Sequence, residues 1–346
     1  MIPLTPREVL IRIARRVLGE NGVYDYLIRR GIALRHLQDG YIEKCDGESL
    51  GGESGADRNG NGSKVHQTLV FMADGKWMHG GLTDRLRGMT SAYKFAIEHN
   101  LDFKIYHTSP FDLQEILQPN KINWIIEKTE IAHDSKRAKP VLLYREDFDN
   151  DSALERQLDT SHEQFHLYSC IDTVNDDFPR FFNELFKPSA ILEKELEHYG
   201  KLLGENYTAI SFRFQNKLGD FKEFTFKELA ARDKQDLLEA SMNVLKHVAE
   251  QAQATQKILV TADSPTFLAE AEKLPQVVTV KGKSIHIDFN NSKNATDYLK
   301  AFTEFFLISK ASKAMLYHNR KYKTYPSNFP KYAALLGNVP YETIEQ

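Results

Sequence analysis

The feature that most constrains this chain is a strand, helix, strand order that occurs twice along its length. An apolar run at 68–73 leads through a glycine turn into a helical pattern at 83–100 and a second strand-like run at 102–108. This order is the βαβ unit of a parallel sheet, because parallel neighbours need a crossover that is usually a helix. The sequence therefore predicts an α/β fold whose first sheet begins near residue 68.

The second half of the chain repeats the pattern after a helix that is predicted at 188–204. The stretch between the halves is mixed, with one strand at 140–146 and otherwise helix and loop. In the second half, strands are predicted at 207–214, 257–263, 277–280 and 314–318, and helices at 234–252, 264–274, 298–311 and 329–337. Two α/β halves predict two domains, at 1–187 and 188–346. Ligands are expected in the crevice between them, at the carboxyl ends of the strands.

Composition limits the class of protein. The 346 residues are 41% hydrophobic and 27% charged, as in globular proteins. A net charge of −3 argues against a nucleic-acid partner, because phosphate neutralisation needs a basic surface. Cys45 and Cys170 are too few for a disulfide framework or a zinc cluster. They favour two thiols in a reducing compartment, with a disulfide as the lesser alternative, and we expect a cytoplasmic protein without a leader or membrane span.

Two segments before the first strand have their own signatures. Residues 5–19 form an amphipathic helical pattern whose polar face carries several arginines. This helix is expected either to pack on the first domain or to rest on an anionic inner membrane face. Residues 46–63 are rich in glycine and nearly devoid of apolar side chains. They predict a flexible surface loop, either inert or ordered by a ligand.

The first candidate site is the glycine turn before the helix at 83–100. Gly80 and Gly81 let backbone N–H groups approach an anion at the helix N-terminus. Arg85 adds positive charge for a phosphate or a carboxylate. The alternatives are an ordinary turn and, for Asp84, an ion pair with a nearby arginine on the helix surface.

The second and third candidates follow two apolar strands of the second half. Arg213 stands at the carboxyl end of its strand, where a guanidinium can bind a diphosphate or pair with a neighbouring carboxylate. Asp263 ends the next strand, where an acid can accept from a base edge or a ribose hydroxyl. The alternative for Asp263 and Ser264 is that they only cap the following helix.

Five segments in this order resemble the fucosyltransferase superfamily. That superfamily includes rhizobial nodulation, core α1,6-, plant xyloglucan and protein O-fucosyltransferases. The matching segments are GGLTDRLRG (80–88), PFDLQEILQPNKINW (110–124), FRF (212–214), TADS (261–264) and YPSNFPKYAA (325–334). The resemblance covers about residues 68–340. It departs from the family at Ser211 and Thr83, where histidine and glycine are usual, so the identity of the donor stays open.

The resemblance implies a GT-B fold, in which two Rossmann-like domains face a crevice and the second holds the donor. It implies transfer of fucose from GDP-fucose with inversion, with the GDP-sugar as substrate, no cofactor and no metal. Arg213 matches the arginine that contacts the donor diphosphate, and Asp263, followed by Ser264, matches the acid that recognises guanine. The other matches are Ser327, Asn328 and Phe329 near phosphate and sugar, and Gly80, Gly81 and Arg85 facing the crevice.

The sequence therefore predicts an inverting, metal-independent glycosyltransferase, with fucose transferred to a glycan or a lipid-linked saccharide. The alternatives are the same fold with another nucleotide-sugar donor and a non-catalytic protein that binds nucleotides or sugars. Asp84, Asp220 and Glu223 are unranked candidates for the general base. The aromatic segment FPRFFNELF at 178–186 is expected to pack in the core, and sugar stacking is the lesser alternative.

Overall fold

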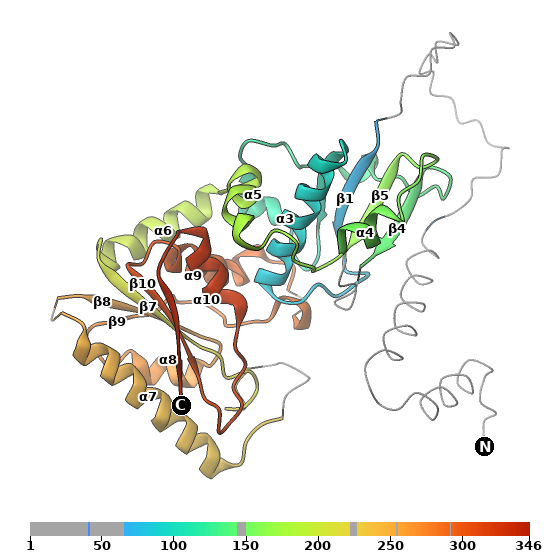
Figure 1. Ribbon diagram of the computed structural model, residues 1–346. Helices are drawn as coiled ribbons and strands as arrows, with labels where there is room; N and C mark the ends of the chain where they lie inside the picture. The colour runs from blue at the N-terminus through green and yellow to red at the C-terminus, as the bar shows by residue number, and fades with distance from the viewer. Residues whose placement is uncertain (1–40, 42–65, 144–149, 222–226, 254, 291) are drawn as a thin grey trace, which may run out of the picture.

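The computed structural model describes residue 41 and residues 66–143, 150–221, 227–253, 255–290 and 292–346. The described part folds into two parallel β-sheets with helices around them (Figure 1). No helix in these ranges is long and apolar enough to cross a membrane. The predictions for 5–19, 46–63, Cys45 and Glu223 lie outside the described residues.

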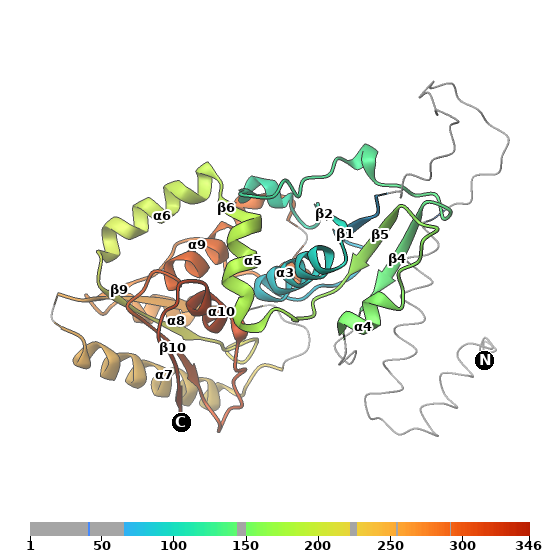
Figure 2. The same cartoon turned by 45° about the horizontal axis from the view of Figure 1, so that its top comes forward.

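The first sheet holds four parallel strands in the order β2-β1-β5-β4. Its strands are β1 (Thr68–Ala73), β2 (Asp102–His107), β4 (Ala138–Leu142) and β5 (Gln164–Tyr168). Strand β1 is the apolar run TLVFMA, and it is buried from its second residue onward because both faces of the sheet are covered. Helix α3 (Leu82–Glu98) crosses from β1 to β2 as predicted, and α5 (Phe178–Leu185) packs beside it (Figure 2).

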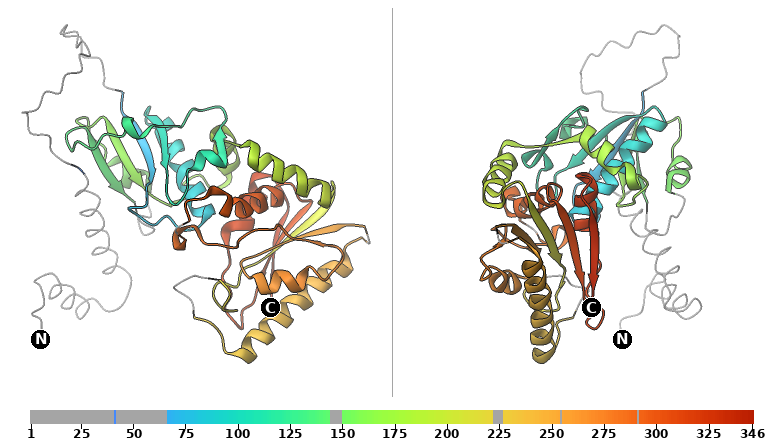
Figure 3. Two further views of the ribbon diagram at one scale, coloured as in Figure 1. Left: turned by 180° about the vertical axis from the view of Figure 1, so that it is seen from behind. Right: turned by 60° about the vertical axis from the view of Figure 1, so that its left-hand side comes forward.

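The second sheet holds five parallel strands in the order β9-β8-β7-β10-β11. They are β7 (Tyr207–Phe212), β8 (Lys257–Ala262), β9 (Val277–Val278), β10 (Lys313–His318) and β11 (Tyr341–Glu345). Helices α7 (Ala231–Gln251) and α8 (Pro265–Ala271) cover one face, and α6 (Ala190–Leu203), α9 (Leu299–Ile308) and α10 (Asn328–Leu336) cover the other (Figure 3). The strand order reverses between β7 and β10, and such a switch point opens a crevice at the carboxyl ends of the two strands.

The two sheets are joined by a shared apolar core. Helix α10 of the second half packs against α3 and α5 of the first half. The rings of Phe178 and Tyr332 meet edge to face at 5.1 Å. All four phenylalanines of the segment 178–186 are buried, which confirms the prediction of core packing. This core fixes the edges of the two sheets against each other.

Short elements complete the described chain. The strands β3 (Leu117–Pro119) and β6 (Phe186–Pro188) form an antiparallel pair just before α6. The remaining elements are α4 (Asn150–Glu155), η1 (Leu113–Glu115), η2 (Lys128–Glu130), η3 (Asn175–Asp177), η4 (Ile287–Phe289) and η5 (Ala295–Asp297).

The structure contains strands that the sequence did not predict. They are β3, β5, β6 and β11, and β5 lies inside the first sheet between β1 and β4. Strand β9 has two residues where four were predicted at 277–280. The segment QFHLY of β5 alternates polar and apolar side chains, but its five residues are too short a run to distinguish it from loop by period alone.

Candidate functional site

A cavity of about 1000 Å³ opens at the carboxyl ends of both parallel sheets. Its walls include the loop after β1, Cys170 after β5 and the ends of β7 and β8, which places it at the predicted crevice. The predicted site residues that line it are Gly80, Gly81, Asp84, Arg213, Asp263, Ser327, Asn328 and Phe329, and those that do not are Arg85, Asp220 and Ser264. A cavity of this size is large enough for a nucleotide sugar.

Arg213 stands at the switch point, directly after β7. Its Nη1 donates to Asp263 Oδ2 over 2.5 Å, and its side chain keeps 19% of its surface exposed. The guanidinium lies over the ring of Phe221 at 5.0 Å. Arg213 is therefore paired with a carboxylate, as the alternative interpretation expected, and it also lies on the cavity wall, as the diphosphate interpretation expected.

Asp263 holds the loop that follows β7. Besides Arg213, its carboxylate accepts from the backbone N–H groups of Phe214 at 2.9 Å and Gln215 at 2.7 Å. Burial raises the pKa of Asp263, and Arg213 with the two amides opposes that shift because each of them stabilises the carboxylate. Its two oxygens are thus engaged by three donors from its own chain. The guanine-reading role implied by the resemblance stays a prediction and competes with these bonds.

Ser264 and Asp220 belong to the start of α8 rather than to the cavity. Ser264 is fully buried and its Oγ accepts from the N–H of Phe267 at 3.1 Å, which is an N-cap bond. Asp220 Oδ2 accepts from Ser264 Oγ at 2.6 Å and from the N–H of Thr266 at 2.9 Å. Ser264 therefore caps the helix that follows, as the alternative interpretation expected, and Asp220 binds at the same helix N-terminus.

The N-terminus of α10 faces the cavity. Ser327 is its N-cap, with Oγ accepting from the N–H of Phe329 at 3.2 Å. Asn328 and Phe329 in the first turn line the cavity as predicted. The free N–H groups at a helix N-terminus favour anions, so this wall and Arg213 supply positive potential to the same space.

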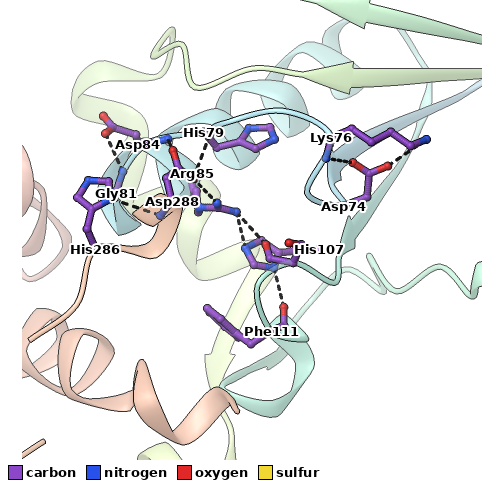
Figure 4. A network of polar contacts seen from close by, with 12 residues as sticks. Asp74, Lys76, His79, Gly81, Asp84, Arg85, His107, Phe111, His286 and Asp288 are labelled. Carbon is purple, nitrogen blue, oxygen red and sulfur yellow. Dashed lines mark hydrogen bonds and ion pairs between the residues drawn. The ribbon is translucent and has the colours of Figure 1, made fainter. Parts of the chain in front are cut away.

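The glycine loop is filled by a carboxylate of the second half of the chain. Asp288, on η4, accepts from Arg85 Nη2 at 2.6 Å, from the N–H of His79 at 3.4 Å and from the N–H of Gly80 (Figure 4). Arg85 also donates to the Nε2 of His107 at 3.1 Å. The side chains of Arg85 and Asp288 keep only 5% and 3% of their surface exposed. The prediction that Arg85 faces the crevice is therefore wrong, because Arg85 binds Asp288 at the boundary between the domains.

Two uncharged histidines flank this boundary. Burial, together with Arg85, lowers the pKa of His79 to about 4. Burial, together with Arg213, lowers the pKa of His286 to about 4. Both line the cavity, and both imidazoles are neutral at pH 7. His79 Nδ1 donates to the carbonyl of Ser169, and its Nε2 has no hydrogen-bond partner within the described ranges.

Asp84 and His286 converge on Gly81 from the two domains. A Cβ on Gly81 would lie 3.8 Å from His286 Nε2 and 4.0 Å from Asp84 Oδ2. Asp84 also accepts from the N–H of Gly81 at 3.1 Å and from Arg87, so the predicted ion pair on the helix exists. Figure 4 shows the two side chains on either side of Gly81. Of the two groups, the carboxylate can accept a proton here, because the Nδ1 of His286 already accepts from the N–H of Asp288 at 3.3 Å.

Sequence reasoning missed four residues of this region. Asp288 and His286 come from a loop without a recognisable motif, so no local signal points to them. Lys300 and Glu304 line the cavity from α9, and their signal was present as two charges at i, i+4 in an otherwise apolar helix. Across the described part of the chain, no three His, Cys, Asp or Glu side chains are grouped so as to hold a metal ion.

The comparisons with known proteins find likeness in structure only. No family model matches the chain, and no curated protein matches it by sequence. A variant of FUT1 from Arabidopsis thaliana, in complex with GDP, matches 97% of this chain and 78% of its own, with a TM-score of 0.52 and 11% identity. The chain has a GT-B fold. This fold accounts for the two sheets and for the cavity between their carboxyl edges.

Two further solved structures match less closely. Fucosyltransferase NodZ from Bradyrhizobium gives a TM-score of 0.48 and 13% identity over 81% of this chain and 96% of its own. POFUT1 in complex with GDP gives a TM-score of 0.44 and 11% identity over 81% of this chain and 98% of its own.

Proposed function

We propose that this protein is a glycosyltransferase that binds a nucleoside-diphosphate sugar in the cavity between its two sheets. The observation that carries the proposal is the meeting of Arg213 and the N-terminus of α10 at one cavity, at the switch point of the second sheet. A diphosphate is the ligand group that both features favour. The GT-B fold supports the proposal, and the FUT1 variant of the same fold was solved with GDP.

The proposed donor sugar comes from the sequence resemblance, and the proposed reaction uses the cavity wall. We propose GDP-fucose as donor, on the strength of the five sequence segments named above, and a glycan or lipid-linked saccharide as acceptor. The acceptor hydroxyl attacks the anomeric carbon from the face opposite the diphosphate, so the configuration inverts. Arg213 and the N–H groups beside Ser327 stabilise the charge that develops on the departing diphosphate.

The reaction needs a general base that takes the proton of the acceptor hydroxyl. Asp84 and His286 meet beside Gly81 on the cavity wall, and we propose the Asp84 carboxylate as the proton acceptor. Asp220 accepts hydrogen bonds from Ser264 and Thr266 at the start of α8, so we do not propose it as the general base. The Nδ1 of His286 accepts from the N–H of Asp288 at 3.3 Å, so the neutral ring carries its hydrogen on Nε2, the atom nearer Gly81, and does not take the proton there.

A cytoplasmic location and contact of residues 5–19 with an inner membrane face stay proposals, since these residues lie outside the described part. A sedimentation assay with anionic liposomes tests the contact. The full-length chain should be retained more than a chain lacking residues 1–20, because basic side chains attract anionic lipid. Equal retention at low salt would contradict it.

The second candidate is a non-catalytic protein that binds a nucleotide or a sugar. One observation favours it, namely that Arg213 and Asp263 already satisfy each other without a ligand. A donor-hydrolysis assay separates the two candidates, because only an enzyme releases fucose and GDP from GDP-fucose. Release of both products at a rate that scales with protein concentration supports the transferase.

A thermal-shift panel tests donor binding. GDP should raise the melting temperature, whereas UDP, CDP and ADP at the same concentration should not. A ligand at 100 times its dissociation constant stabilises the folded state by about 2.7 kcal/mol, which is easily measured. Equal shifts from GDP and UDP would contradict the guanine assignment, and no shift from any nucleotide would contradict the proposed function.

A further inference from the structure

Helix α9 presents a buried ion pair to the cavity. Lys300, in its first turn, donates to Glu304 Oε1 one turn later, and their side chains keep only 4% and 9% of their surface exposed. Both residues line the cavity. Apart from Thr303, the rest of α9 is apolar, with Phe302, Phe305 and Phe306 buried in the core.

The position of this pair needs an explanation beyond stability. Moving two charges out of water carries a large desolvation penalty, and the attraction between them rarely exceeds it by much. Glu304 Oε1 binds Lys300, while Glu304 Oε2 and the other ammonium protons of Lys300 have no hydrogen-bond partner in the described ranges. A carboxylate oxygen and an ammonium group are therefore left available, side by side, on a cavity wall.

The nearest other acid on this wall is already engaged. Asp263 accepts from Arg213 and two backbone amides, so its oxygens have little capacity left for a ligand. Asp263 lies close enough to Glu304 to act on it, because burial first and then the charge of Asp263 raise the pKa of Glu304. The two acids thus share one end of the cavity, and only Glu304 has an open oxygen there.

We propose that Lys300 and Glu304 form the base-recognition subsite of this protein and that they bind the Watson–Crick edge of guanine. Among the common bases, guanine alone sets two N–H donors, N1–H and the 2-amino group, beside a carbonyl oxygen. The Glu304 carboxylate accepts from the two donors, and the Lys300 ammonium donates to O6. This inference rests on the proposed function, since it assigns the base of the donor nucleotide to a pair on α9 rather than to Asp263.

The test measures nucleotide affinity by calorimetry with GDP, IDP and ADP. IDP keeps N1–H and O6 but lacks the 2-amino group, and ADP has neither N1–H nor O6. The main variant is the double substitution Lys300→Met with Glu304→Met, which keeps length and packing because a buried pair is often replaced by apolar side chains without loss of stability. The matched control makes the same changes, Glu197→Met with Lys201→Met, at the exposed i, i+4 pair of α6.

The native protein and the control should bind GDP about tenfold more tightly than IDP and about 10²-fold more tightly than ADP, as expected for bidentate base contacts. The double variant should lose about 10² in GDP affinity and bind the three nucleotides alike. Glu304→Gln, a smaller change in case the double variant does not fold, should abolish the GDP-to-IDP ratio. Asp263→Asn should leave that ratio intact.

Three outcomes would overturn the inference, and they are distinguishable. A native protein that binds none of the three nucleotides contradicts the proposed function and this subsite together. A native protein that prefers GDP, with folded α9 variants that keep the same affinity and ratio, contradicts the subsite alone. If Asp263→Asn loses the GDP-to-IDP affinity ratio and Glu304→Gln keeps it, Asp263 recognises guanine and the α9 pair does not.

Discussion

The glycine loop before α3 and the end of β7 have similar sequence features but different structural roles. Each places an arginine and backbone N–H groups at the carboxyl edge of a parallel sheet, and each was predicted as a possible anion site. In the glycine loop, Arg85 binds Asp288 and is 5% exposed. At β7, Arg213 binds Asp263 but keeps 19% of its side chain open to the cavity.

The comparison teaches that an anion-binding geometry does not identify its anion. The N–H groups of the glycine loop bind a carboxylate from the second half of the chain, so this loop joins the two domains. The end of β7 has its own carboxylate as well, but a ligand can still reach the guanidinium. Exposure to the cavity, which the sequence does not reveal, separates the two arginines.

The largest effect on stability is expected at the domain boundary. Asp288→Ala leaves the buried guanidinium of Arg85 without its carboxylate, and breaking a buried pair costs about 3–5 kcal/mol. Chemical denaturation measures the loss. The control Glu197→Ala removes a carboxylate from an exposed pair on α6 and should leave the midpoint unchanged. An Asp288→Ala protein as stable as the control would mean that the boundary does not depend on this pair.

Acid should weaken the same boundary. His79 and His286 have folded pKa values of about 4 against an ordinary value of 6.5, so the unfolded chain takes up their protons first as the pH falls. Above pH 6.5 both histidines are neutral in the folded and the unfolded chain, so they do not change stability with pH. Between pH 6.5 and 4, each histidine lowers the free energy of unfolding by an amount on the order of 3 kcal/mol. Denaturation midpoints across this window measure it. His79→Gln should flatten the slope, and an unchanged slope would refute this cause.

The two adjacent glycines of the loop should respond differently to alanine. Gly80 has a φ of +81°, and a Cβ there would lie 2.5 Å from the Asp84 carboxylate, so Gly80→Ala should cost about 1–2 kcal/mol or more. Gly81 has a φ of −75° and a Cβ would be in ordinary contact, so Gly81→Ala should cost well under 1 kcal/mol. Thermal melts of the pair measure both. Equal losses of stability in the two variants would show that the positive φ of Gly80 is not the reason for a glycine there.

The smallest effect should come from chelation. The proposed reaction uses Arg213 and a helix N-terminus to stabilise the leaving diphosphate, so turnover of GDP-fucose in excess EDTA should equal turnover without it. The assay is run on the same preparation before and after chelation. Activity that falls with EDTA and returns with manganese would show that a metal ion does this work.

Much of the fold was predictable because helical and strand periods are local. Helices α3, α6, α7, α8, α9 and α10 were predicted to within a few residues, and so were β1, β2, β7, β8 and β10. Strand β5 was missed because its alternating run QFHLY has only five residues, which is short for a prediction from period alone. Its place inside the sheet is a long-range fact that no window of sequence contains.

The site was predictable where residues follow strands and unpredictable where the chain folds back. Arg213, Asp263 and Ser327 reach one cavity because parallel strands end at one edge. Asp288 binds the N–H of Gly80 from more than 200 positions away in the sequence. No sequence pattern near either residue predicts this contact. The same reason explains the wrong or unconfirmed roles of Arg85, Ser264 and Asp220. Arg85 binds Asp288, and Ser264 binds Asp220, and both partners are far away in the sequence.

Turnover and melting temperature of one Arg213→Ala preparation test the central claim most directly. The account predicts a turnover number per folded molecule that is about 10²–10³ lower, the scale for losing one oxyanion donor, with partial recovery in Arg213→Lys. Because Arg213 also pairs with buried Asp263, the melting temperature should fall as well. A lower melting temperature with an unchanged turnover number would show that Arg213 is only a structural partner of Asp263, and would contradict the account.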